Sequence, residues 1–454
     1  MIVDLLIKNA KIVSPNGVHD GCVAVNDGCI IAIGIEESMP SAEKIIDAKG
    51  KFLIPGAIDL HVHFRDPGLT YKEDFSTGSM AAAIGGVTTI FDMPNTQPPV
   101  VDIDGFETKR KIAEEKSYVN YAIYSFLLDG NQNNIDELID AGVAGFKWDM
   151  SAANWELPDG YRIPDNISAL QSFKKIAAHG YNVGVHAEDM SIVNFFVEEF
   201  KKAGRIDYRA HAESRPDFVE VAAIQRAVLL AEITKCHLHI HHLSSEKGLD
   251  YILQKKAEGL SITCEVGPQW FLFNADDYDD MGASIKTYPA IKEKSDASAL
   301  WKGLSDGLID CYATDHAPHS YEEKFERTWY DCSPGANGVE TSMPLMMDKI
   351  NKGELSIERY VSFACENPAR IYGLYPRKGV IMVGSDADLV LIDMDYEWTI
   401  TNESLSSKNH ITPFHGWKIK GKPMLTIVNG QVVMEDGKIV GKPSGKLVNP
   451  KQEW

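Results

Sequence analysis

Six residues that can bind a metal ion lie at the ends of short apolar segments of this sequence. They are a pair of histidines spaced two apart, a lysine, two single histidines and an aspartate: His61, His63, Lys147, His186, His242 and Asp315. Neutral imidazoles and carboxylate oxygens suit zinc better than calcium or magnesium. Taken singly, such a histidine is more often structural, and Lys147 would be a solvated side chain. Together the six residues predict a metal site, because they end five different predicted strands.

Eight apolar segments alternate with helix-like segments, such as 75–86, 167–180 and 219–235, along the middle of the chain. This alternation predicts an α/β fold, a (β/α)8 TIM-type barrel, in which the chemistry lies at the carboxyl ends of the strands. Residues i and i+2 of a strand point to the same face, so both imidazoles of His61 and His63 are expected to enter the barrel. The predicted strands are 52–63, 87–93, 120–127, 143–148, 182–188, 237–244, 261–266 and 310–316.

Both ends of the chain have a different pattern, with apolar segments on either side of two-residue turns. The turns are Asp27-Gly28 near the start, and Asn429-Gly430 and Asp436-Gly437 near the end. Such pairs are strong signals for β-hairpins. We therefore expect one small β-sandwich domain built from residues 1–52 and 380–454, with the barrel, residues 53–379, inserted between them.

Composition restricts the functional classes. The chain has 454 residues, 44% of them hydrophobic, and 45 Lys and Arg stand against 65 Asp and Glu, so the formal net charge is −20. Such a charge repels phosphate backbones, and no basic patch compensates for it, so we expect no nucleic-acid partner. Seven scattered cysteines without a C-x-x-C pair indicate reduced thiols. The N-terminal segment is interrupted by charges, which predicts a cytoplasmic protein with no membrane span.

Seven motifs stand out along the barrel segment: D-L-H-V-H-F-R-D-P-G (59–68), G-G-V-T-T-I-F-D-M-P-N-T (85–96), G-F-K (145–147), H-A-E (186–188), H-H-L-S-S (241–245), A-T-D-H-A-P-H (313–319) and N-P-A-R-I-Y-G-L (367–374). Together they resemble the motifs of the cyclic amidohydrolases, with dihydroorotase nearest and the allantoinases and hydantoinases next. A further motif, G-S-D-A-D-L-V-L-I-D (384–393), is similar to the strand where that family re-enters its β-sandwich.

The resemblance implies two zinc ions per chain. One would be held by His61, His63 and Asp315 and the other by His186 and His242, with Lys147 bridging them once carbon dioxide has carboxylated it. Asp149 is the alternative bridge, because one branch of dihydroorotases uses an aspartate nearby. Asp315 would also move the proton during catalysis. His239 and His241, in the same predicted strand as His242, are interpreted as structural.

The resemblance further implies a small cyclic amide substrate, dihydroorotate, whose carboxylate Arg65, Asn95 and His319 would bind. Two alternatives give these residues purely structural roles: Arg65 pairs with Asp66 or Glu73, and Asn95 caps a turn.

The chain departs from the dihydroorotase pattern at Tyr288 and Gln269, so allantoin, dihydrouracil and hydantoin stay open as substrates. A non-catalytic scaffold for other pyrimidine enzymes is a further alternative. We also expect a homo-oligomer, either a dimer or a tetramer.

Overall fold

A ring of short parallel strands forms the centre of the molecule. The computed structural model describes residues 2–151 and 157–450. Two hydrogen-bonded groups of strands make the ring, in the orders β6-β7-β8 and β14-β13-β12-β11-β10-β9. Their bounds are Ala57–Val62 (β6), Val87–Asp92 (β7), Asn120–Ile123 (β8), Ser125–Phe126 (β9), Phe146–Asp149 (β10), Asn182–His186 (β11), His237–Ile240 (β12), Ile262–Val266 (β13) and Cys311–Tyr312 (β14).

Two connections between the two groups of strands close the ring. The predicted strand 120–127 is divided at Tyr124 into β8, which pairs with β7, and β9, which pairs with β10. On the opposite side, a parallel bridge joins Val62 to His316, and the His63 backbone N donates to the His316 backbone O at 2.8 Å. The bridge brings the predicted metal ligands His61 and His63, at the end of β6, next to the segment that follows β14.

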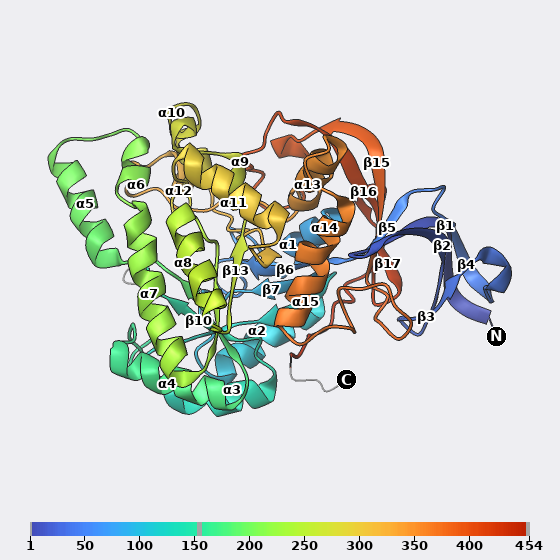
Figure 1. Ribbon diagram of the computed structural model, residues 1–454, viewed down its shortest axis with the longest axis horizontal. Coiled ribbons are helices and arrows are strands. Elements are labelled where there is room, and N and C mark those ends of the chain that lie inside the picture. Colours follow the sequence, from blue (N-terminus) through green and yellow to red (C-terminus); the bar gives the residue numbers. More distant parts are fainter. Residues whose placement is uncertain (1, 152–156, 451–454) are drawn as a thin grey trace.

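Helices cover the outside of the ring (Figure 1). Asp74 and Asp165 begin two of them as N-caps that accept hydrogen bonds from backbone N–H groups of the first turn. The outer helices are α1 (Phe75–Ile84), α2 (Ile103–Lys116), α3 (Ile135–Ala141), α4 (Asn166–Ala178), α7 (Asp217–Thr234), α8 (Glu246–Ala257), α11 (Lys294–Asp306), α14 (Ile357–Val361) and α15 (Asn367–Ile371). Further helices occupy the connections: α5 (Met190–Lys202), α6 (Arg209–Glu213), α9 (Gln269–Leu272), α10 (Tyr278–Met281), α12 (Tyr321–Phe325) and α13 (Ser342–Asn351).

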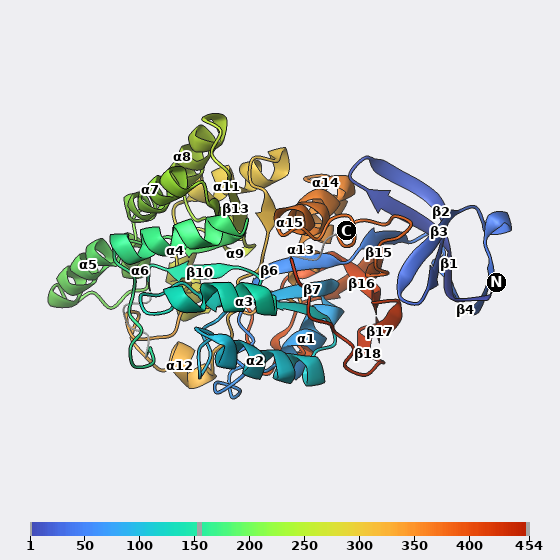
Figure 2. The same ribbon diagram turned by 90° about the horizontal axis from the view of Figure 1, so that it is seen from below.

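Strands from both ends of the chain pair in one sheet beside the barrel (Figure 2). They share an apolar core that includes Leu5, Val25, Leu389 and Ile427. The strand order is β18-β17-β16-β15-β5-β1-β2-β3, with β4 against β1. The strands are β1 (Ile2–Ser14), β2 (Gly17–Asn26), β3 (Cys29–Gly34), β4 (Ser41–Asp47), β5 (Phe52–Pro55), β15 (Leu389–Thr399), β16 (Lys418–Val428), β17 (Gln431–Glu435) and β18 (Lys438–Ile439).

The hairpins predicted from sequence are present. Asp27 and Gly28 join β2 to β3 with φ angles of 50° and 78°, and Asn429 and Gly430 join β16 to β17 with 50° and 79°. Positive φ at both turn residues is what a tight hairpin requires. The predicted fold class is thus confirmed, whereas the domain limits at 52/53 and 379/380 stay a prediction. In the described part of the chain, every helix is too short or too polar to cross a membrane.

Candidate metal centre

A cavity of about 680 Å³ opens at the carboxyl ends of the barrel strands. All six predicted metal ligands line it, as do Asp149 and the three residues predicted to bind substrate. They come from the ends of β6, β7, β10 and β11 and from the segments after β12 and β14. Arg65 and His319, which are 254 positions apart in sequence, thus meet in one cavity, as the joint pattern predicted.

The first group of ligands surrounds one carboxylate oxygen. Asp315 Oδ1 lies 3.0 Å from His63 Nε2 and 3.4 Å from His61 Nε2. The opposite nitrogens of both rings are already bound: His61 Nδ1 lies 2.7 Å from Glu265 Oε1, and His63 Nδ1 lies 2.7 Å from Asn95 Oδ1. Because Nδ1 donates in both rings, both Nε2 atoms present lone pairs toward Asp315.

The second group consists of His186 and His242. His186 Nδ1 lies 2.9 Å from His242 Nε2, and His186 Nε2 lies 2.8 Å from Glu188 Oε2. Burial, together with nearby positive groups, lowers the pKa of His242 well below its ordinary value, so this ring is neutral. With His186 Nε2–H donating to the Glu188 carboxylate, the Nδ1 lone pair of His186 points at His242.

This arrangement fits metal ions. In the first group, the Nε2 lone pairs of His61 and His63 lie within 3.5 Å of a carboxylate oxygen of Asp315. Such contacts repel unless a cation lies between the atoms. A metal-bound histidine usually donates its second N–H to a carboxylate or carbonyl, and His61, His63 and His186 each have such an acceptor. The donor set of imidazoles and a carboxylate is the one that zinc prefers.

Lys147 is a buried lysine of the cavity. Its side chain is 3% exposed, and Nζ makes no hydrogen bond or ion pair within the described residues. Burial lowers the pKa of Lys147 from its ordinary value, although Asp149, Asp315 and Glu265 act in the opposite direction. A buried unpaired ammonium is costly, whereas a neutral amine can react with carbon dioxide. The alternative bridge, Asp149, already accepts hydrogen bonds from Ser151 N at 2.9 Å and Ser151 Oγ at 2.6 Å.

Behind the first group, one buried carboxylate orients several histidines. Glu265, on β13, contacts His61 Nδ1 at 2.7 Å, His241 Nδ1 at 2.9 Å and His239 Nε2 at 3.0 Å. The structural interpretation of His239 and His241 agrees with these contacts, because both rings face Glu265. Sequence reasoning missed Glu265 and Glu188. The available signal was a spacing of two residues, which places side chains on the same face of a strand. Glu188 follows His186 by two residues, and Glu265 follows Thr263 by two residues.

Three residues around the cavity adopt left-handed backbone conformations. The φ angles are 61° at Arg65, 34° at His242 and 47° at Asp315. Such angles are uncommon for residues other than glycine and cluster at functional sites, where the surrounding structure holds them. Each of these residues follows the end of a strand, so the turn directs its side chain into the cavity.

Arg65 has no acidic partner among the described residues, although its side chain is buried at 6% exposure. Its Nη2 lies 3.2 Å from His319 Nε2, and its Nε has no partner. Pairing with Asp66 or Glu73 does not occur: Asp66 binds Lys116 at 2.8 Å, and Glu73 accepts from Lys408 N at 3.2 Å.

The other two predicted substrate residues are engaged with protein groups. Asn95 Oδ1 contacts the metal-site residue His63, which leaves the amide N–H groups of Asn95 for a ligand. His319 contacts Arg65 through Nε2 and lies 3.3 Å from Lys72 Nζ and 3.4 Å from Glu323 Oε2 through Nδ1. In this arrangement His319 supports the Arg65 side chain.

Of the two departures from the dihydroorotase pattern, only Tyr288 lines the cavity. Its ring stacks under the Arg215 guanidinium, 3.8 Å from the ring centroid, and against His211 at 5.5 Å. Arg215 Nη1 in turn lies 2.8 Å from Glu188 Oε1. Gln269 is buried and donates to the Thr314 backbone O at 3.0 Å, so its effect on substrate is at most indirect.

Comparison with known proteins identifies the family. Residues 52–433 match the model of the amidohydrolase family. The chain is 38% identical over 442 residues to L-hydantoinase of Paenarthrobacter aurescens, covering 96% of both chains. It is 33% identical to an allantoinase of Rubrobacter xylanophilus, covering 99% of this chain and 98% of the other. It is 35% identical to a dihydroorotase of Pyrococcus furiosus, covering 95% and 93%.

A solved structure agrees with these relatives. L-hydantoinase (dihydropyrimidinase) from Arthrobacter aurescens superposes with a TM-score of 0.94 at 37% identity, over 97% of this chain and 98% of that one. These relatives are named as enzymes, which argues against the alternative of a non-catalytic scaffold. The chain belongs to the amidohydrolase family and is a metal-dependent cyclic amidohydrolase.

Proposed function

We propose that the protein hydrolyses dihydroorotate reversibly to N-carbamoyl-aspartate. The observation that carries the proposal is Arg65, a buried guanidinium that lines the metal cavity without an acidic partner in the described part of the chain. A buried unpaired charge costs free energy, and a substrate carboxylate would compensate for it through the planar fork of N–H groups. Dihydroorotate has such a carboxylate, whereas dihydrouracil, hydantoin and allantoin do not.

The residues of the cavity have different roles in this proposal. His61, His63 and Asp315 would hold one zinc ion and His186 and His242 the other, with carboxylated Lys147 between them. Bound there, the ions would lower the pKa of a water molecule and polarise the ring carbonyl. Asp315 Oδ2 makes no hydrogen bond within the described residues, because its contacts are made through Oδ1. We assign to Oδ2 the proton that passes from the attacking water to the leaving ring nitrogen.

Hydantoin hydrolysis is the second candidate. Two observations favour it: Tyr288 lines the cavity where dihydroorotases carry asparagine, and the L-hydantoinase relative is 38% identical over nearly the whole chain. An aromatic wall stacked on Arg215 offers a flat apolar face to a ring.

A panel of four rings tests the proposal. Zinc-loaded protein is expected to turn over dihydroorotate about a hundredfold better than dihydrouracil, hydantoin or allantoin, because each charge-assisted hydrogen bond contributes roughly 1.5–3 kcal/mol. Arg65→Lys keeps the charge but loses the fork. This variant should lower kcat/KM for dihydroorotate strongly, with zinc content unchanged and with little effect on uncharged rings.

A matched control separates the fork from the overall charge of the cavity. Lys201 lines the same cavity from α5 but pairs with Glu198 at 3.1 Å. Lys201→Met should leave the preference for dihydroorotate intact. A wild-type preference for hydantoin or allantoin, or an equal loss on every ring in Arg65→Lys, would reject the proposed substrate.

A further inference from the structure

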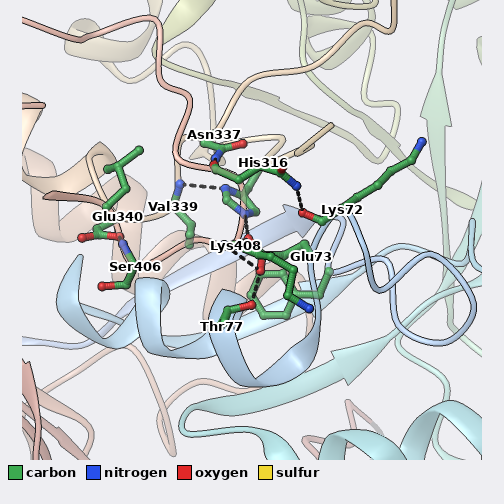
Figure 3. A network of polar contacts seen from close by, with 12 residues as sticks. Lys72, Glu73, Thr77, His316, Asn337, Val339, Glu340, Ser406 and Lys408 are labelled. Atoms are coloured by element: carbon green, nitrogen blue, oxygen red, sulfur yellow. Dashed lines mark hydrogen bonds and ion pairs between the residues drawn. The ribbon is translucent and has the colours of Figure 1, made fainter. Parts of the chain in front are cut away.

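A buried polar cluster lies where the sheet of the chain ends meets the barrel (Figure 3). Three segments form it: residues 70–77 after β6, residues 316–340 after β14, and residues 405–409 between β15 and β16. We name residues 405–409 the strap. Asn409 Nδ2 donates to the Lys72 backbone O at 2.5 Å, and Asn337 Nδ2 donates to the Asn409 backbone O at 2.5 Å. The strap therefore connects the two barrel segments that flank the metal centre.

Glu73 is the centre of this cluster. Its side chain is fully buried and accepts hydrogen bonds from the Thr77 hydroxyl and, at 3.2 Å to each oxygen, from the Lys408 backbone N. Lys408 Nζ donates to the Thr70 backbone O at 2.6 Å and pairs with Asp74, which fixes the strap on this side. On its other side, Glu73 Oε2 lies 3.5 Å from His316 Nε2.

The His316 ring is held through Nδ1 and faces Glu73 through Nε2. Its Nδ1 accepts from the backbone N of Gly338 at 3.2 Å and of Val339 at 3.5 Å, which places the ring N–H at Nε2. Nε2 makes no hydrogen bond in the described part of the chain, and Glu73 Oε2 is the acidic oxygen in contact with it, at 3.5 Å. Glu73 is therefore the group that the free N–H of this buried ring faces.

The backbone of His316 belongs to the metal centre. Its carbonyl accepts from the His63 backbone N at 2.8 Å, and His316 forms bridges with both Val62 and Ala336. Asp315, the preceding residue, has a φ angle of 47° and places Oδ1 3.0 Å from His63 Nε2. A non-glycine residue keeps such a conformation only when its surroundings hold it. The neighbouring residue His316 is fixed through its backbone bridges and through its ring.

We propose that Glu73 is a positioning residue for Asp315, which acts through the His316 ring and is itself held in place by the strap. The sheet of the chain ends thereby contributes to the geometry of the reaction. The inference rests on the role proposed for Asp315 but not on the identity of the ring substrate. The competing interpretation is that Glu73 is only an anchor between sheet and barrel.

Glu340 offers a matched control. Like Glu73, it is a buried carboxyl group that accepts from a backbone N of the strap, Ser406 N, at 2.7 Å. It makes no contact with His316 that involves a hydrogen bond or ion pair within the described residues. Burial raises the pKa of Glu340 to about 8, so the group is mainly protonated at pH 7 and glutamine imitates it closely. Glu340→Gln thus keeps an acceptor for Ser406 N and leaves the His316 contact unchanged, so it controls for the exchange of a buried carboxyl group for an amide beside the strap.

The experiment compares Glu73→Gln with Glu340→Gln in the zinc-loaded full-length protein. The glutamine amide at position 73 must turn its NH2 group toward another donor, either His316 Nε2–H or the Lys408 and Thr77 donors. We expect kcat to fall roughly tenfold or more with KM within about twofold, and zinc to be lost at a roughly tenfold lower chelator concentration. Glu340→Gln should keep all three quantities within about twofold, and thermal unfolding measures the stability of both variants.

A second variant covers the case in which Glu73→Gln does not fold. His316→Asn keeps an acceptor on the side of Gly338 but removes the N–H that faces Glu73, so it should reproduce the loss of kcat and of zinc retention. Where both single variants fold, the double variant should be no worse than either one, because both changes break the same interaction. Full additivity, or a Glu73→Gln variant that loses only thermal stability while kcat and zinc retention stay like those of Glu340→Gln, overturns the inference. Zinc retention needs no substrate, so failure of the dihydroorotate proposal would leave this test intact.

Discussion

Replacing Asp315 with asparagine is expected to lower kcat by roughly a hundredfold or more with little change in bound zinc. The amide keeps an oxygen that can occupy the place of Oδ1, 3.0 Å from His63 Nε2 and 3.4 Å from His61 Nε2. It cannot accept and return a proton at the position of Oδ2. Steady-state kinetics, together with metal analysis of the same sample, measures both effects.

The two readings in that experiment must be taken together. A variant that loses zinc along with activity shows that the carboxylate charge is needed for metal binding, and this outcome leaves the proton transfer to be measured at saturating zinc. Near-normal kcat with zinc fully bound would assign the proton transfer to another group of the cavity and contradict the role given to Asp315.

Replacing Lys147 with alanine is expected to have an effect at least as large, because it removes the proposed bridge between the two metals. We expect kcat below about a hundredth of wild type and a loss of bound zinc. A short carboxylic acid such as acetate or propionate, added to the variant, should restore part of the activity, since it supplies the missing carboxylate to the space left by the side chain. Activity against acid concentration, at constant ionic strength, is the measurement.

Asp149→Asn is the control for Lys147→Ala. Asp149 lines the same cavity, but its carboxylate accepts two hydrogen bonds from Ser151. If Lys147 is the bridge, the asparagine variant should keep most of its zinc and activity. If Lys147→Ala stays active without added acid and Asp149→Asn is inactive, the bridge is assigned to Asp149.

Local patterns in the sequence predicted the parts of the fold that depend on near neighbours. The spacing of His61 and His63 predicted that both rings enter the barrel, and both line the cavity. The turn Asp27-Gly28 predicted a hairpin, and its φ angles of 50° and 78° confirm it. The division of 120–127 into β8 and β9 was not predicted, because it depends on which neighbours the strand pairs with and not on its own apolar pattern.

The support of the site could not be predicted, because it depends on contacts between distant residues. Glu73 and Lys408 are 335 positions apart, and no pattern around either residue indicates the other. The alternative that Arg65 pairs with Asp66 or Glu73 rested on nearness in sequence and is wrong, since both acids have other partners. The positive φ angles of Arg65, His242 and Asp315 could not be predicted from sequence either, because none of these residues is a glycine.

The central claim is a pair of metal ions bridged by the buried side chain of Lys147. The most direct measurement is the molar ratio of zinc to protein after the apoprotein has been reconstituted with zinc, with and without bicarbonate. The account predicts a ratio close to two with bicarbonate and a clearly lower ratio without it, because carbon dioxide supplies the bridging carboxylate. A fully active protein with one zinc ion or none, or a ratio that does not depend on bicarbonate in an apoprotein freed of carbon dioxide, would contradict the account.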